Sequence, residues 1–196
     1  MVSVAGALVL AVAVFGPTTT HAAPVLHSLA SPTSLAAQAA VGKNAPAFTA
    51  KGSDGKNYSL RSLAAKGPVF LYFIKSDCPV NADAVKYYNK LGSSYRGKAT
   101  FLGVINGDAS VYRTWQAQYK ATYPVLLDPG KKIITGFGAQ ASPWVIEVGK
   151  GGKIAKVWEG YSVKDLNALN SSMAKAAKVK LVKLDTTGAP STNRYG

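Results

Sequence analysis

The sequence predicts an α/β protein built on one central mixed sheet with helices on both faces. Apolar runs at residues 69–74, 99–105 and 123–127 alternate with helical patterns. Such alternation favours parallel strands with helices packed on the sheet. A glycine-rich hairpin with strands at 143–148 and 153–158 then closes the sheet in antiparallel fashion.

Local signals justify each element in chain order. β-branched and aromatic runs favour strands, whereas a Pro at the first helical position or a Ser or Asp cap favours a helix start. The remaining expected elements are an extended entry at 41–50, a tight turn at Asp54-Gly55, a helical turn at 59–65, a helix from Pro79, a helix capped by Asp108 or Ser110, one or two helical turns at 131–137, and a closing helix capped by Ser162.

The first 23 residues have the character of a secretory signal peptide. Residues 2–15 are apolar, and the small residues that follow suit cleavage near Ala22 or Ala23. The usual basic n-region is absent, since no Lys or Arg lies between Met1 and Lys43. A membrane anchor is the alternative, although the run is shorter than the roughly 20 apolar residues that span a bilayer. We therefore expect an exported protein, periplasmic or extracellular.

The rest of the chain has room for one domain of ordinary size. Residues 24–40 are rich in Ala and Ser and predict a flexible spacer, and residues 41–184 hold the predicted domain. Residues 185–196 are mostly small and polar, which predicts a disordered tail.

Histidine content and charge exclude several function classes. The only two histidines, His21 and His27, lie in or just after the leader. The domain therefore has no imidazole for a serine–histidine hydrolase or for histidine-ligated zinc or copper. The net charge of +14 is spread along the chain. This pattern predicts salt-dependent adsorption to acidic surfaces rather than specific nucleic-acid binding.

The single cysteine, Cys78, is the strongest candidate for chemistry. It follows the apolar strand at 69–74 and directly precedes Pro79, so it is expected at a helix N-terminus. Free backbone N–H groups and the helix dipole favour a thiolate there, while the neighbouring Asp77 acts in the opposite sense. The alternative interpretation is a small buried hydrophobe. With one cysteine in the chain, no internal disulfide can form.

The order of these elements resembles the thioredoxin fold. Several motifs are similar to those of the redoxin branch, which contains the alkyl hydroperoxide reductase and thiol-specific antioxidant proteins. The motifs are Gly42-x-x-Ala45-Pro46-x-Phe48, the Asp54-Gly55 turn, Leu60-x-x-Leu63, the apolar strand before Cys78-Pro79, and Ser142-Pro143-x-x-Ile146.

The resemblance implies a site made of Cys78, Pro79, Ser142 and Pro143. Cys78 would be the catalytic sulfur. Pro143 would be the proline that faces it, cis in the family, and Ser142 would offer backbone bonding to a partner chain. The alternative for Pro143 is a simple strand opener. No cofactor and no metal are implied.

Two departures from the family limit the chemistry. Asn81 stands where thioredoxin-like oxidoreductases carry a second, resolving cysteine, so dithiol exchange by this chain alone is excluded. No Arg lies near Ser142-Pro143 in the sequence, and Lys75 is a poor substitute for the arginine of typical peroxiredoxins.

Three hypotheses remain open. The first is an exported thiol-dependent antioxidant or oxidoreductase, in which Cys78 reacts with a peroxide or a disulfide and an external thiol recycles it. The second is a non-catalytic thioredoxin-like binding module of the cell envelope. The third is a homodimer linked through Cys78.

Overall fold

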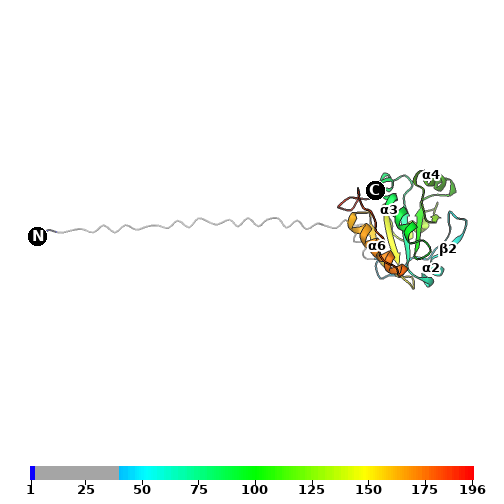
Figure 1. The fold of residues 1–196 in the computed structure, drawn as a ribbon, viewed down its shortest axis with the longest axis horizontal. Helices are drawn as coiled ribbons and strands as arrows, with labels where there is room; N and C mark the ends of the chain where they lie inside the picture. The colour runs from blue at the N-terminus through cyan, green and yellow to red at the C-terminus, as the bar shows by residue number, and fades with distance from the viewer. Residues whose placement is uncertain (3–39) are drawn as a thin grey trace.

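The computed structural model describes residues 1–2 and 40–196 (Figure 1). Apart from residues 1–2 and residue 40, the predicted signal peptide and the predicted spacer lie outside these residues. The elements are β1 (Thr49–Lys51), β2 (Asn57–Ser59), α2 (Leu60–Lys66), β3 (Val69–Ile74), α3 (Pro79–Ser94), β4 (Thr100–Ile105), α4 (Ala109–Tyr119), β5 (Val125–Leu127), α5 (Lys132–Gly136), β6 (Trp144–Val148), β7 (Ile154–Glu159) and α6 (Val163–Ala177).

The central sheet is mixed, as predicted, with strand order β5-β4-β3-β6-β7. β3 pairs in parallel with β4 and in antiparallel with β6, so it lies in the middle of the sheet. All six residues of β3 are buried. This confirms that its continuous apolar run reflects a strand covered on both faces.

Two hydrophobic clusters cover the two faces of the sheet. Alternate residues of β3 enter different clusters because successive side chains of a strand point to opposite faces. Phe70 and Tyr72 pack with residues of α3, α4 and α6. Leu71 and Phe73 pack with residues of α2 and α5. The predicted arrangement of helices on both faces is therefore confirmed (Figure 1).

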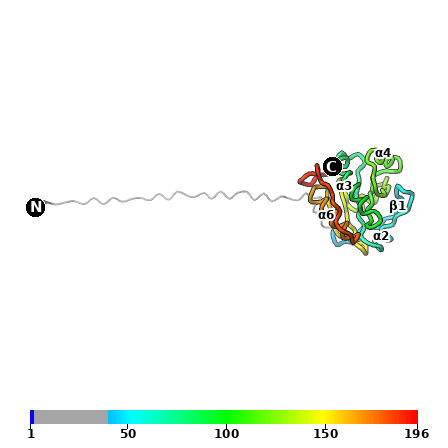
Figure 2. Tube along the Cα trace, in the orientation of Figure 1, coloured from blue at the N-terminus to red at the C-terminus, as the bar shows by residue number. Residues whose placement is uncertain are grey.

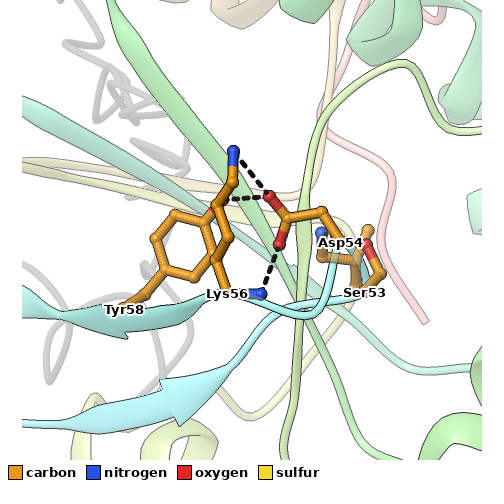
Figure 3. A network of polar contacts seen from close by, with 5 residues as sticks. Ser53, Asp54, Lys56 and Tyr58 are labelled. Atoms are coloured by element: carbon orange, nitrogen blue, oxygen red, sulfur yellow. Dashed lines mark hydrogen bonds and ion pairs between the residues drawn. The ribbon is translucent and has the colours of Figure 1, made fainter.

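The Asp54-Gly55 turn joins β1 and β2, as the sequence predicts. The Asp54 carboxylate accepts hydrogen bonds from the Lys56 backbone N–H at 3.2 Å and the Tyr58 hydroxyl at 2.8 Å (Figure 3). Ser53 ties the turn to β5, because its N–H donates to the Val125 carbonyl at 2.7 Å and its Oγ accepts from the Val125 N–H at 3.1 Å. The hairpin is thereby held at the edge of the main sheet.

Side-chain caps begin two of the helices. Asp108, one of the two predicted candidates, caps α4 by accepting from the N–H groups of Ser110 and Val111. Ser162 caps α6 by accepting from the Asp165 N–H, as predicted. None of the helices in the described part of the chain combines the length and apolar character needed to cross a membrane.

Residues 185–196 differ from the mobile tail that their composition suggests. The segment returns across the domain to the start of α3 (Figure 2). Arg194 and Tyr161 exchange two backbone hydrogen bonds of 3.0 Å, and Gly196 and Ser142 exchange two of 2.9 and 2.8 Å. Backbone N–H and C=O groups are present in every residue except proline, so a small, polar composition does not prevent this kind of attachment.

Candidate functional site

Cys78 lies where strand β3 passes into helix α3. It is the N-cap residue of α3, and Pro79 occupies the first helical turn, as the sequence predicts. The Cys78 N–H donates to the Lys75 carbonyl at 3.1 Å, which closes the turn between strand and helix. Its side chain is only 3% exposed. The sulfur is therefore positioned at the helix N-terminus but lies beneath other groups.

The structure brings Ser142 to Cys78 from 64 residues further along the chain. The Cys78 Sγ lies 3.5 Å from the Ser142 carbonyl oxygen, a distance at which the thiol donates a weak hydrogen bond. The Ser142–Pro143 peptide bond is cis, as the family resemblance implies. Pro143 is buried, and its carbonyl accepts from the Gly160 N–H at 2.8 Å. Pro79, in contrast, is exposed beside the cysteine.

A buried asparagine connects the two halves of this site. The Oδ1 of Asn81 accepts from the Tyr72 hydroxyl at 2.8 Å and lies 2.9 Å from the Ser142 Oγ. Its Nδ2 donates to the Lys75 carbonyl at 2.8 Å. Asn81 has no exposed surface. It therefore fixes the first turn of α3 to the loop that carries Ser142.

Two further contacts complete this network. The Ser142 Oγ accepts from the Lys75 N–H at 3.2 Å and lies 3.0 Å from the Phe73 carbonyl, so its single proton can be donated either there or to Asn81. Burial raises the pKa of Tyr72 well above its ordinary value, which keeps the hydroxyl protonated as a donor.

The structural role of Asn81 was not predicted from the sequence, in which this residue stands only where a second thiol is missing. The available signal was a polar residue between Val80 and Ala84 on the apolar side of the helix that follows Cys78. A buried amide needs several partners. Those partners come from β3 and from the loop before β6, so only the folded chain identifies them.

The charged candidates contribute less to the site than the sequence suggested. The side chains of Lys75 and Asp77 are exposed, and Lys75 acts in the polar network through its backbone. Trp144 packs in the cluster on the opposite face of the sheet from Cys78. Within residues 1–2 and 40–196, no group of three or more acidic, histidine or cysteine side chains is placed to hold a metal ion.

One arginine does approach α3, through the C-terminal segment. Arg194 lies two residues before Gly196, and its guanidinium forms an ion pair of 3.0 Å with Asp83 on α3. The sequence gave no reason to place it there, because it is 51 residues beyond Pro143. Its charge is paired with a carboxylate, unlike that of a free anion-binding arginine.

This fold and this cysteine position define a thioredoxin-like protein. Two solved structures share the fold. A thioredoxin domain of a thiol-disulfide oxidoreductase from Bacteroides vulgatus gives a TM-score of 0.57 at 23% identity, covering 68% of this chain and 98% of that one. A secreted disulfide oxidoreductase from Mycobacterium tuberculosis gives 0.55 at 18% identity, covering 65% and 95%.

Within that class, the chain belongs to the AhpC/TSA family, whose sequence profile matches residues 41–157. A thiol-disulfide oxidoreductase ResA from Bacillus thuringiensis is 30% identical over 127 residues, which cover 64% of this chain and 73% of the relative. A chloroplastic peroxiredoxin Q from Suaeda salsa is 32% identical over 123 residues, covering 59% of this chain and 54% of the relative. The chain is thus similar to proteins named for each of the two chemistries expected of Cys78.

Proposed function

We propose that this protein is an exported one-cysteine thiol-disulfide oxidoreductase. The observation that supports this function best is the pairing of Cys78 Sγ with the Ser142 backbone, whose N–H and C=O both bond the backbone of Gly196 in the structure. Residues that bind a strand beside a sulfur suit a substrate whose disulfide is part of a peptide chain. The names of the ResA and disulfide oxidoreductase relatives agree with this assignment.

The reaction requires two exchanges because the chain has one thiol. The Cys78 thiolate attacks one sulfur of the substrate disulfide, the S–S bond breaks, and the other sulfur leaves as a thiolate. A mixed disulfide between Cys78 and the substrate remains. An external thiolate then attacks the substrate sulfur of this mixed disulfide, which releases the Cys78 thiolate and leaves a disulfide between the external thiol and the substrate. The external thiol therefore supplies the electrons that free the first substrate thiolate. Asn81 cannot take this second role.

A first experiment tests the exchange directly. The purified protein is incubated with oxidised glutathione, and the glutathione adduct is followed by intact mass, with Cys78→Ser as the control. We expect a Cys78-dependent adduct that disappears when an added thiol is supplied. Because Cys78 is only 3% exposed and Gly196 lies beside it, the rate is measured in the full chain and in a variant without residues 194–196, and we expect the variant to react faster than free cysteine. Adduct formation no faster than with free cysteine in both proteins would contradict the proposal and favour the non-catalytic binding module.

Peroxide reduction is the second candidate, and the peroxiredoxin Q relative favours it. The Cys78 thiolate would attack the O–O bond, giving a sulfenic acid and, from hydrogen peroxide, water; external thiols would reduce the sulfenic acid through a disulfide. Trapping of sulfenic acid at Cys78 during rapid hydrogen peroxide consumption would select this chemistry. Non-reducing gels in the same experiment would reveal a covalent homodimer as a band of doubled mass.

Export is tested separately from chemistry. The full chain is expressed in a bacterial host, and the N-terminus of the product outside the cytoplasm is determined. We expect cleavage near Ala22 or Ala23 because small residues follow the apolar run there. An uncleaved protein retained in the cytoplasmic fraction would contradict this part of the proposal.

A further inference from the structure

The C-terminal segment, residues 193–196, lies directly over the cysteine site. Its backbone passes from Tyr161, which follows β7, to Ser142, which precedes β6. A Cβ atom placed on Gly196 would lie 3.0 Å from the Cys78 Sγ and 3.2 Å from a methyl carbon of Val80. A side chain at position 196 would thus come closer to the sulfur than an ordinary van der Waals contact, so Gly196 lies beside Cys78, which is only 3% exposed.

Gly196 and Ser142 form one reciprocal pair of backbone hydrogen bonds. The Ser142 N–H donates to the Gly196 carbonyl at 2.9 Å, and the Gly196 N–H donates to the Ser142 carbonyl at 2.8 Å. Two residues that exchange both bonds form the hydrogen-bonded pair of an antiparallel ladder. The Ser142 carbonyl that receives the Gly196 N–H is also the one that lies 3.5 Å from Cys78 Sγ. The segment thus binds to the atoms that we assign to substrate binding.

Few side-chain contacts hold the segment in place. The Arg194–Asp83 ion pair has both side chains about half exposed, and pairs of this kind stabilise little. The Asn193 Nδ2 donates to the Glu159 carbonyl at 3.0 Å, on the surface. Two backbone hydrogen bonds to Tyr161 and two to Ser142 complete the attachment. Local opening of a short segment held by this small set of contacts needs less free energy than global unfolding. The segment can therefore leave while the domain stays folded.

We propose that residues 193–196 are an internal ligand of the Cys78 site, bound where an extended peptide segment of a partner must bind. The segment carries no cysteine, so Cys78 has no disulfide to attack while it is in place. A partner has to displace it before its own disulfide reaches the sulfur. The close approach at Gly196 also means that the partner residue opposite Ser142 is small. The regulatory consequence rests on the proposed function, whereas the occupancy of the site does not.

A cross-linking experiment tests the occupancy. An S–S bond of about 2.04 Å places each Cβ about 3 Å from the partner sulfur, which is the separation between a Cβ at position 196 and the Cys78 Sγ. Gly196→Cys is therefore expected to form an intramolecular disulfide under mild oxidation, seen as a linked pair of peptides in a protein of monomer mass. Ser191→Cys, an exposed position in the same tail, is the control. Equal cross-linking at both positions, or only intermolecular products from Gly196→Cys, would overturn the proposal.

A labelling experiment tests the covering of Cys78. The rate of alkylation by a bulky maleimide is compared between the unaltered protein, a variant without residues 194–196, and Arg194→Glu. Removal of the segment is expected to raise the rate at least about tenfold because a local opening step is no longer needed. Arg194→Glu is expected to raise it about two- to fivefold, as for loss of an exposed ion pair. Arg113→Glu, an exposed arginine on α4, should leave it unchanged.

The two experiments separate this inference from the proposed function. If the rate of alkylation is the same with and without residues 194–196, the internal-ligand proposal is wrong. If the cross-link forms and the truncated protein is alkylated faster, yet Cys78 in that truncated protein reacts with oxidised glutathione no faster than free cysteine, the segment covers the sulfur and the oxidoreductase function fails.

Discussion

The β1–β2 hairpin and the cysteine site each contain a tyrosine hydroxyl that donates a hydrogen bond of 2.8 Å to a side chain, and these two networks differ in burial. In the β1–β2 hairpin Tyr58 donates to Asp54, in a largely exposed turn (Figure 3). In the cysteine site Tyr72 donates to Asn81, and both residues are fully buried. Water can replace a lost partner in the first network but not in the second. Two hydrogen bonds of equal length are therefore expected to contribute unequally to the free energy of unfolding.

The largest effect is expected from removal of the buried amide. Asn81→Ala leaves the buried Tyr72 hydroxyl without its acceptor, and the Lys75 carbonyl loses one of its two donors but keeps the Cys78 N–H. An unsatisfied buried polar group costs about 1–3 kcal/mol and a lost hydrogen bond about 0.5–1.5 kcal/mol, so we expect the free energy of unfolding to fall by about 3 kcal/mol. Urea denaturation measures this change. The matched control is Asn57→Ala, an exposed asparagine in β2, and a loss as small as in the control would contradict the argument.

The matched tyrosine pair should give the next largest difference. Tyr72→Phe keeps the ring that stacks on Tyr88 at a centroid distance of 4.1 Å but removes the donor to Asn81. We expect the free energy of unfolding to fall by about 1–2 kcal/mol, and by less than about 0.5 kcal/mol for Tyr58→Phe, because water can satisfy the exposed Asp54. Equal losses in urea denaturation would show that burial does not distinguish the two networks.

A smaller effect concerns tyrosine ionisation. Burial, together with the hydrogen bond and the negative charge of Asp54, raises the pKa of Tyr58 to about 12. Asp54→Asn removes the charge, so the pKa should fall toward the ordinary value of about 10. The stability linked to the raised pKa is present below pH of about 10 and is lost as the pH rises through about 12. NMR titration of Tyr58 measures the shift, and an unchanged pKa would assign it to burial alone.

The smallest effect is expected from the exposed ion pair of the hairpin. Lys56 Nζ lies 3.6 Å from the Asp54 carboxylate, and the lysine side chain is 76% exposed. Lys56→Ala should change the free energy of unfolding by less than about 0.5 kcal/mol, since exposed ion pairs contribute little. Thermal unfolding at low and high salt measures this. A loss above 1 kcal/mol would mean that the hairpin network is not governed by solvent exposure.

The two networks also differ in how far the sequence could predict them. The hairpin network joins residues that are two and four positions apart, and the Asp54-Gly55 pair indicated the turn. The Asn81 network joins β3, the start of α3 and Ser142, which is 61 residues away. No local sequence pattern around Asn81 indicates a partner so far along the chain. An unexplained polar residue within an apolar helical face was the only signal available.

The amino-acid sequence by itself determined the fold class, the central strand β3 and the place of Cys78 at the start of α3. These features depend on local order: apolar alternation, a proline at the helix start and a glycine-rich hairpin. It also excluded histidine chemistry in the domain and an internal disulfide, since these depend only on which residues are present.

Only the tertiary structure decided what surrounds the sulfur. It brought Ser142 to Cys78, gave Asn81 its partners and laid Gly196 over the site. The segment that covers Cys78 is attached mainly through backbone N–H and C=O groups. Because almost every residue carries these groups, the amino-acid composition does not indicate such an attachment. Residues 185–196 therefore have the composition of a disordered tail, although their last residues are bound where we propose that a partner peptide binds.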